Sequence, residues 1–371
     1  MELNTYMPVK LVVGAGCVRG SFAELAKLGR ICLIVTGKRG AKISGALQDV
    51  TETLDRNGQK WLLFDDIGQN PRLTDCMAAA EMAIAAGADF VVGIGGGSAL
   101  DAAKCIAVLA ANPGMTQSRL YSFDWAKPPL KIVAVGTTAG TGSEVTKVSV
   151  ITTPDGRKKS FHHELIFPTL SLGDPNYTMT QSKDVTCGTM VDALAHCAES
   201  FFSRSANHIS RLYAVEGIRL LLPEMRKMVE NGGKTLDYAT RERLYLASLY
   251  GGLAINVTGT CFPHTMGYLL TERFGVPHGT ACALFQPDFY AYNKSVVPNL
   301  TAEFLERVGS TEEEYLELIE KLTPKCEISM EQDLITQAHS RWIGNGSLAK
   351  CQGVFTAHMA DELLRRKFLV K

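Results

Sequence analysis

The chain has 371 residues, of which 46% are hydrophobic, so it is long and apolar enough for two domains with substantial cores. Lys plus Arg and Asp plus Glu balance at 38 each, which disfavours nucleic acid or an anionic membrane as the main partner. No stretch approaches ~20 uninterrupted apolar residues, and the first residues lack the basic and apolar regions of a signal peptide, so we expect a cytoplasmic protein without a spanning helix.

The first half of the sequence alternates short β-branched runs with amphipathic helical stretches such as 74–86. Alternation of this kind is typical of a largely parallel sheet covered by helices. The predicted strands are 10–13, 31–36, 61–65, 90–94 and 131–135, with 148–152 and 169–172 as a further hairpin or edge.

Beyond about residue 180, long helical patterns dominate the sequence. The predicted helices are 184–203, 209–230, 240–256, 279–292, 302–307, 312–322 and 331–342. The sequence therefore predicts an α/β domain over 1–178 and an all-α domain over 179–371. Ten cysteines are scattered over both halves without a Cys-x-x-Cys pair, and we interpret them as buried free thiols of a reducing compartment.

Two glycine-rich segments follow predicted strands. The first, Gly95-Gly-Gly-Ser98, precedes a predicted helix, whose unpaired N–H groups and dipole favour a pyrophosphate. The second, from Gly136 to Thr146, places hydroxyls and glycines after the next strand, at the same edge of a parallel sheet. Each alone could be an ordinary turn or polar loop, but together they favour a nucleotide site. The glycines of 14–20 miss the dinucleotide spacing by one residue and are interpreted as a turn.

The end of the predicted strand 31–36 bears on the choice of nucleotide. NAD sites usually place a carboxylate there to hold the 2′-hydroxyl of the adenosine ribose, but this chain has Gly37 followed by Lys38, Arg39 and Lys42. Such a segment would accept a 2′-phosphate, so NADP(H) is favoured over NAD(H), although a solvated basic loop is about as good an explanation of these residues alone.

One aspartate and three histidines form a candidate metal site. Asp192 and His196 are four residues apart on a predicted helix and therefore share a face. His264 and His278 follow in one later segment. A carboxylate with three imidazoles suits Fe²⁺ or Zn²⁺. Any one of these histidines alone would more often be a core residue, so the prediction rests on the set.

These motifs together resemble the iron-containing (group III) alcohol dehydrogenases. The resemblance covers roughly residues 5–295 and is carried by 95–104, 137–146, 191–196 and the segment from His264 to Gly279. It implies a dehydroquinate synthase-like fold, with a Rossmann-like dinucleotide-binding domain, a helical metal-binding domain and the metal in the cleft between them. Gly37 is similar to NADP-using members, especially a 1,3-propanediol-dehydrogenase-like subgroup.

The resemblance also assigns roles to residues of this chain. It implies that Asp192, His196, His264 and His278 are the metal ligands, through which catalysis occurs. Many relatives carry a further histidine, proposed as a proton relay, where this chain has Tyr268, so a relay there is in doubt and packing is favoured. The cofactor contacts expected are Gly37, Lys38, Asn70, Gly95, Gly96, Gly97, Ser98, Asp101, Thr137, Thr138, Thr141, Ser143, Thr146, Val150 and Lys159.

The function expected is a reversible hydride transfer between NADP(H) and a small primary alcohol or diol, in a homodimer or higher homo-oligomer. Three alternatives remain: a glycerol-dehydrogenase-like enzyme, a metal-independent reductase on the same fold, and a non-catalytic cofactor-binding protein. The complete ligand set disfavours the first, and the ligand set together with the intact glycine segment disfavours the third. Metal analysis would separate the second.

Overall fold

The computed structural model describes residues 5–232 and 236–370. Within these residues the chain divides into two compact units, one formed by 6–181 with 236–245 and the other by residue 5, 182–232 and 246–370. Helix α10 (Tyr238–Thr258) contributes residues to both units. The single domain boundary expected near residue 178 stays a prediction.

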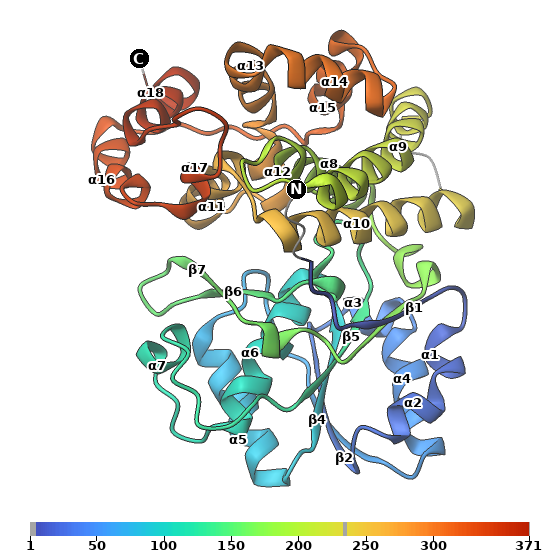
Figure 1. Ribbon diagram of the computed structural model, residues 1–371. Helices are drawn as coiled ribbons and strands as arrows, with labels where there is room; N and C mark the ends of the chain where they lie inside the picture. The colour runs from blue at the N-terminus through green and yellow to red at the C-terminus, as the bar shows by residue number, and fades with distance from the viewer. Residues whose placement is uncertain (1–4, 233–235, 371) are drawn as a thin grey trace. The chain divides into compact units, whose positions relative to one another are not determined.

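The first unit is built on a six-stranded parallel sheet (Figure 1). Each neighbouring pair of strands runs parallel, and the carboxyl ends of β4 and β5 are in register at Gly95 and Gly136. The strand order is β1 (Lys10–Val13), β8 (Leu170–Gly173), β5 (Lys131–Gly136), β4 (Phe90–Gly95), β2 (Ile31–Thr36) and β3 (Lys60–Phe64). The parallel sheet predicted from the strand–helix alternation is thus confirmed.

One expectation about the later strands was wrong, and one strand was missed. Strand β8 lies inside the sheet, between β1 and β5, rather than in a hairpin or at an edge. The partner of β6 (Val148–Thr152) is β7 (Lys158–His162), which pairs with it antiparallel and was not predicted. The sequence of β7, Lys-Lys-Ser-Phe-His, buries only Phe161, so it carries too little apolar alternation to signal a strand.

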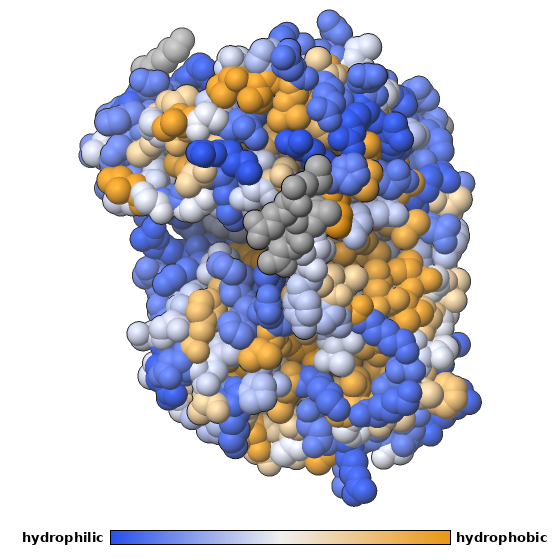
Figure 2. Space-filling model, in the orientation of Figure 1, coloured by the Kyte–Doolittle hydropathy of each residue, from blue (hydrophilic) through white to orange (hydrophobic). Residues whose placement is uncertain are grey.

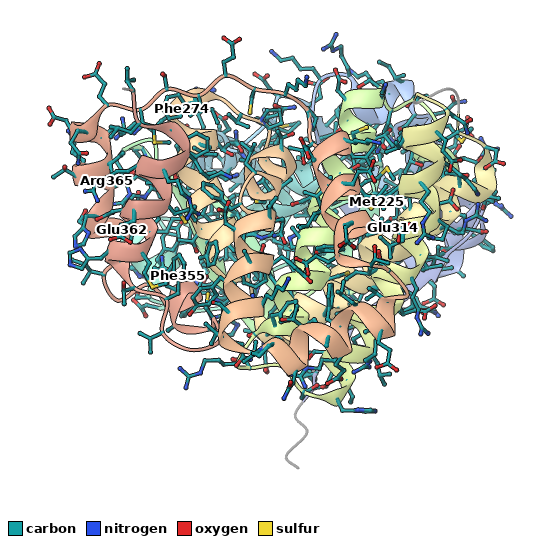
Figure 3. The ribbon with its side chains drawn as sticks, turned by 90° about the horizontal axis from the view of Figure 1, so that it is seen from above. Met225, Phe274, Glu314, Phe355, Glu362 and Arg365 are labelled. Atoms are coloured by element: carbon teal, nitrogen blue, oxygen red, sulfur yellow. The ribbon has the colours of Figure 1, made fainter. Side chains whose placement is uncertain are left out.

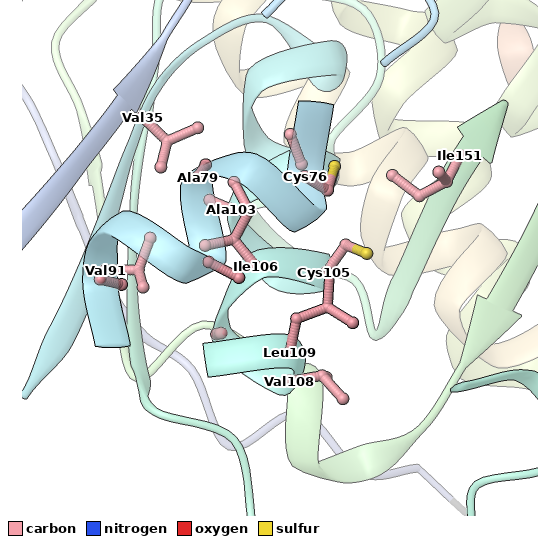
Figure 4. Close-up of a cluster of buried hydrophobic side chains, with 14 of the residues drawn as sticks. Val35, Cys76, Ala79, Val91, Ala103, Cys105, Ile106, Val108, Leu109 and Ile151 are labelled. Atoms are coloured by element: carbon pink, nitrogen blue, oxygen red, sulfur yellow. The ribbon is translucent and has the colours of Figure 1, made fainter. Parts of the chain in front are cut away.

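Side chains of the central strands enter two separate cores, one on each face of the sheet. In β2, Leu33 and Val35 belong to one cluster, and Cys32 and Ile34 belong to the other. This is the period-two alternation of a strand whose two faces are both covered. The first cluster, shown in Figure 4, packs against α5 (Leu73–Ala86) and α6 (Gly97–Ala111). The second packs against α1 (Cys17–Gly20), α2 (Phe22–Ala26), α3 (Gly40–Ile43) and α4 (Ala46–Arg56). A further short helix of this unit is α7 (Gln117–Tyr121).

The second unit is helical, as predicted (Figure 3). An ion pair joins two of its helices: the Arg226 guanidinium donates Nε to Glu314 Oε1 at 2.6 Å and Nη2 to Oε2 at 3.0 Å, and Figure 3 labels Glu314 next to Met225. With α10, its helices are α8 (Lys183–Phe202), α9 (His208–Glu230), α11 (Phe262–Phe274), α12 (His278–Ala283), α13 (Gln286–Val296), α14 (Pro298–Val308), α15 (Glu312–Leu322), α16 (Gln332–Trp342), α17 (Gly346–Ala349) and α18 (Ala357–Phe368).

The single helix expected over 279–292 is two helices, α12 and α13, separated at Leu284 and Phe285. Pro287 sits in the first turn of α13. Proline has no N–H to donate and disfavours helical backbone in the residue before it, so it fits the start of a helix better than its interior. The apolar periodicity continues across the break, which is why the sequence pattern alone did not reveal it.

The face drawn in Figure 2 mixes hydrophilic residues with smaller apolar patches. Among the described residues, none of the helices combines the length and the apolar character needed to cross a membrane.

Candidate metal centre

Helix α8 supplies the first two predicted ligands. Ser182 caps its N-terminus, where the Ser182 side chain accepts a hydrogen bond from the Val185 N–H. Asp192 and His196 lie one turn apart in its middle, and both side chains are buried. Burying a carboxylate is costly unless it is paired with a cation or coordinates a metal ion, so the position of Asp192 requires a partner.

The other two predicted ligands lie at the beginnings of α11 and α12. His264 is in the first turn of α11, behind Pro263, and His278 is the first residue of α12, behind Pro277. Gly275, with a φ of 66°, ends α11 in the left-handed conformation, so the chain turns within a few residues. This short turn returns His278 to the side of α11 that carries His264.

Gly279 allows α12 to approach α8 closely. A Cβ built on Gly279 would lie 2.0 Å from the carbonyl oxygen of Gly188 and 2.8 Å from Cβ of Asp192. No side chain fits at those distances, so the glycine after His278 is required for the two helices to bring their ligands together.

The four side chains gather in one place within the helical unit. His264 Nε2 lies 3.6 Å from Asp192 Oδ1. The His196 ring stacks on the His264 ring with centroids 4.4 Å apart, and the His278 ring centroid is 5.4 Å from that of His264, with the rings inclined at 71°. The structure therefore brings the predicted ligand residues together, although they lie on three different helices.

Two buried polar atoms in this cluster lack a hydrogen-bond partner among the described residues: Asp192 Oδ1 and His264 Nε2. Buried polar atoms are almost always satisfied, so such a pair needs an explanation. Ligand atoms bound to one metal ion at about 2.0–2.1 Å lie about 3.3 Å apart in tetrahedral geometry, close to the separation found here. The residues present thus fit a divalent cation.

Charge within the cluster favours the ionised form of Asp192. Burial by itself would raise the pKa of this carboxyl, but the neighbouring histidines, His196 foremost, hold the pKa well below its usual range. An ionised carboxylate is the form that coordinates a cation.

Cys282 also lies in this cluster, although sequence reasoning assigned it to the core. Four potential ligand atoms lie within 4.8 Å of one another, one each from Asp192, His264, His278 and Cys282. His196 is not part of this set. Cys282 Sγ is 3.6 Å from His278 Nδ1. Its position four residues after His278 on α12, and so on the same helical face, was the signal that could have identified it.

Glu199 orients one of the predicted ligands and was not identified from the sequence. Its carboxylate is fully buried, and Oε1 lies 2.6 Å from His264 Nδ1. It also accepts hydrogen bonds from Gln286 Nε2 at 2.9 Å and from the Cys261 N–H at 2.7 Å. When His264 donates Nδ1–H to Glu199, the lone pair on Nε2 is directed toward Asp192. Glu199 follows His196 by three residues, so its helical face was the available signal.

We expect Glu199→Gln to weaken metal binding by about 10- to 100-fold, because partners of metal-bound histidines typically contribute that much. The glutamine keeps the volume but not the charge that orients His264. Metal affinity is measured by competition with a chromophoric chelator. Glu224→Gln replaces another buried glutamate of the helical unit and should leave the affinity unchanged. Equal affinities in both variants would show that Glu199 does not position the ligand.

The two glycine-rich segments pack against each other in the other unit. Cβ atoms built on Gly96 and Gly97 would lie 2.7 Å from Thr138 Oγ1 and from Thr141 Cγ2. Gly95 has a φ of +155°, and α6 begins at Gly97 without a side-chain cap. The segments therefore meet at the carboxyl ends of β4 and β5 beside uncapped amides, as a site for an anion requires.

Several residues predicted to bind the cofactor also make hydrogen bonds that hold this unit together. Both oxygens of Asp101 accept hydrogen bonds, Oδ1 from Ser143 Oγ at 2.7 Å and Oδ2 from the Val150 N–H at 2.9 Å. The fully buried Lys104 ammonium donates to Ser143, to Thr146 Oγ1 and to the Val148 carbonyl. Burial, only partly offset by Asp101, lowers the pKa of Lys104 to about 8. These side chains fasten α6 to the second glycine-rich segment.

Asn70 and Lys159, at other predicted cofactor positions, also make contacts within the protein. Asn70 adopts a positive φ of 57° and accepts a hydrogen bond from Lys158 Nζ at 2.8 Å. Lys159 Nζ lies 4.3 Å from the centroid of the Tyr121 ring. Each is therefore held in place by neighbours of its own unit.

Two of the three cations expected to receive a 2′-phosphate have carboxylate partners. Lys38 Nζ lies 2.9 Å from Asp66 Oδ1, and Lys42 Nζ lies 2.6 Å from Asp65 Oδ2. Gly37 is confined, because a Cβ built there would lie 3.0 Å from the Ile67 carbonyl oxygen. The segment is thus less basic than its sequence indicates.

Tyr268 lies beside the predicted metal ligands. Its ring stacks on that of His278, with centroids 5.5 Å apart and an interplanar angle of 24°. The contact places the aromatic face against a predicted ligand, which fits the packing role expected from the sequence.

Comparison with known proteins identifies the family of this chain. The sequence profile described as "Iron-containing alcohol dehydrogenase" matches residues 8–175, and the profile of the C-terminal part of the same family matches 186–334. The chain belongs to the iron-containing alcohol dehydrogenase family. It is an oxidoreductase of the NAD(P)-dependent alcohol dehydrogenase class, and the family resemblance inferred from its motifs is confirmed.

Relatives and solved structures place the chain within this family. It is 32% identical over 286 residues to a 1,3-propanediol dehydrogenase from Citrobacter freundii, an alignment covering 76% of this chain and 72% of the relative. An iron-containing alcohol dehydrogenase from Thermotoga maritima has a TM-score of 0.90 at 30% identity, covering 98% of both chains. A sulfoacetaldehyde reductase from Bifidobacterium kashiwanohense, solved with NAD⁺, has a TM-score of 0.86 at 27% identity, covering 99% of this chain and 98% of the other. The predicted fold class is thereby confirmed.

Proposed function

We propose that this iron-containing alcohol dehydrogenase catalyses reversible hydride transfer between NADP(H) and a small primary alcohol or diol, with Asp192, His196, His264 and His278 holding Fe²⁺ or Zn²⁺. The observation that carries the proposal is the buried Asp192–His264 pair, whose facing oxygen and nitrogen atoms lack hydrogen bonds among the described residues. The similarity of this chain to a 1,3-propanediol dehydrogenase supports a small alcohol as the substrate class.

A divalent cation in this centre would act as a Lewis acid on the oxygen of the alcohol or aldehyde. The protein's own contribution is to hold the ligands in place before the substrate arrives. Glu199 orients His264, and the glycine at 279 keeps α12 against α8. Tyr268 covers one face of His278, which restrains the rotation of that ring.

In the other unit, the amides at the start of α6 and the threonines of the second segment are suited to a pyrophosphate. Gly95, Gly96 and Gly97 leave the backbone bare there, and Thr138 and Thr141 pack directly against it. The buried side chains of Asp101 and Lys104 stabilise this segment through hydrogen bonds to other groups of the protein.

The preference for NADP(H) is tested by comparing kcat/KM for NADPH and NADH with aldehydes from acetaldehyde to butyraldehyde. We expect NADPH to be preferred, and Arg39→Ala to weaken the response to NADPH but not to NADH, because only NADPH carries the 2′-phosphate. A preference for NADH would contradict this part of the proposal, and the carboxylates of Asp65 and Asp66 beside Lys42 and Lys38 would be its physical reason.

The decisive experiment for the whole proposal is anaerobic purification followed by metal analysis and these assays. One bound Fe²⁺ or Zn²⁺ per chain together with aldehyde reduction is the expected result. Activity in metal-free protein would favour a metal-independent reductase on this fold, and a metal-loaded protein without activity on any nicotinamide cofactor would favour a binding protein. The homo-oligomeric state and the cytoplasmic location stay predictions.

A further inference from the structure

A second group of metal-binding side chains lies near the end of the chain. His339 on α16 and His358 and Asp361 on α18 each offer a ligand atom, and these atoms all lie within 4.8 Å of one another. The group shares no residue with the centre described above and lies beyond residue 334, where the match to the family profile ends. We propose that these three residues form a second site for a divalent transition-metal ion such as Zn²⁺, which would join α16 to α18.

The geometry requires only small side-chain movements. His339 Nδ1 is 2.6 Å from Asp361 Oδ2, and the rings of His339 and His358 have centroids 5.1 Å apart. Ligands of one Zn²⁺ ion, bound at about 2.0–2.2 Å, lie about 3.3 Å apart. A slight separation of His339 from Asp361 and a rotation of the exposed His358 would place an ion among all three. His358 and Asp361 are three residues apart on α18 and therefore share a face.

Asp361 is anchored while the two imidazoles remain accessible. Its carboxylate is buried and accepts a hydrogen bond from Trp342 Nε1 at 3.1 Å, whereas His339 is partly exposed and His358 is exposed. The protein thus supplies one fixed carboxylate and two imidazoles at the surface, with room for water to complete the coordination. Three protein ligands with an open position are a common arrangement for zinc.

The charges around the group leave its carboxylate available to a cation. The nearby basic side chains are engaged elsewhere: Arg341 by Glu272, and Arg366 and Lys367 by Asp288. Arg365 donates to Gln332. Glu362, labelled with Arg365 on α18 in Figure 3, is exposed one turn after His358 and adds negative charge to the same face.

The donor set indicates which ions would bind. Two imidazoles and a carboxylate without sulfur suit Zn²⁺, Ni²⁺ and Cu²⁺, whereas Mg²⁺ and Ca²⁺ prefer oxygen ligands only. A hydrogen bond between His339 and Asp361 would by itself explain the contact of those two residues. It leaves the position of His358 against the His339 ring unexplained, and a metal ion explains all three.

The test counts Zn²⁺ bound per chain in the full-length protein by titration against a chromophoric chelator. We expect two equivalents in the unmodified protein and one in His358→Ala, whose affinity for the second ion should fall by at least about 100-fold, since loss of an outer-shell partner alone costs 10–100-fold. His358 is exposed, so its removal should not disturb folding. His208→Ala, which removes an exposed histidine on α9, should retain both ions.

A second variant separates this site from the first. His278→Ala should lose the ion of the catalytic centre and keep the ion at His358, and the double variant should bind none. Zn²⁺ should also raise the Tm of His278→Ala, but not that of the double variant, because an ion that binds only the folded state stabilises it. A single equivalent that is lost in His278→Ala, or a second equivalent that persists in His358→Ala, would overturn the proposal. A single equivalent that is lost only in His358→Ala would instead contradict the metal centre of the proposed function.

Discussion

Replacing His278 by alanine should remove the bound metal ion and reduce kcat by on the order of a thousandfold, which corresponds to about 4 kcal/mol of transition-state stabilisation. His278 is the most informative of the proposed ligands to remove because its side chain is only half-buried, whereas Asp192, His196 and His264 are buried. Its loss should therefore change metal binding more than folding.

Metal content and turnover are measured on the same preparation, and circular dichroism and the Tm report on folding. His208→Ala is the matched control, since it removes an exposed histidine from the same helical unit. Full activity in metal-free His278→Ala protein would end the proposal that catalysis depends on this centre.

The same assay identifies the fourth ligand. The sequence motif assigns that role to His196, whose ring stacks on His264, whereas the geometric cluster contains Cys282 in its place. We expect His196→Ala to lose the metal and Cys282→Ser to keep it. The reverse result would assign the role to the thiolate, and an ion with one sulfur ligand would favour Zn²⁺ over Fe²⁺.

Gly279→Ala should disrupt the metal centre without removing any ligand. The new Cβ would lie 2.0 Å from the Gly188 carbonyl oxygen. Because both atoms are fixed to the backbone, no side-chain rotation can relieve this clash. Relief requires α12 to shift away from α8, which carries His278 away from Asp192. Overpacking of this kind typically costs about 1–3 kcal/mol, and more where backbone is involved, so we expect a clear fall in Tm together with loss of bound metal.

The control for this prediction is Gly346→Ala. Gly346 lies in the first turn of α17 in the same unit, has nothing within 4 Å of a built Cβ, and does not require a positive φ. Alanine there should be neutral or stabilise the protein by up to about 1 kcal/mol through the unfolded state. An unchanged Tm and metal content in Gly279→Ala would mean that α12 and α8 are not as closely packed as the structure has them.

Most elements could be predicted because they follow local patterns. The strands before residue 136 are short, mostly apolar runs, and α15 and α16 are amphipathic, so these local patterns located them within about a residue. The exceptions have local causes. Strand β7 is too polar to signal a strand, and Pro287 divides a continuous apolar pattern into α12 and α13.

Some features depend on contacts between residues distant in sequence. Glu199 meets His264 across 65 positions, and Asp101 meets Val150 across 49. The placement of β8 inside the sheet depends on which strands it pairs with, and the ion pairs of Lys38 and Lys42 depend on where β3 ends. A sequence pattern reports the face or the charge of a residue, but not the partner that neutralises it.

The sequence by itself determined the family, the parallel sheet and the helical half, because glycine spacing, the i,i+4 Asp–His pair and apolar periodicity are local properties of the chain. Only the tertiary structure decided which predicted cofactor residues also hydrogen-bond within the protein, that Glu199 and Cys282 lie beside the predicted metal ligands, and that His339, His358 and Asp361 converge. The physical reason is that packing between helices and strands determines how buried polar groups pair. The sequence of a single segment does not determine that packing.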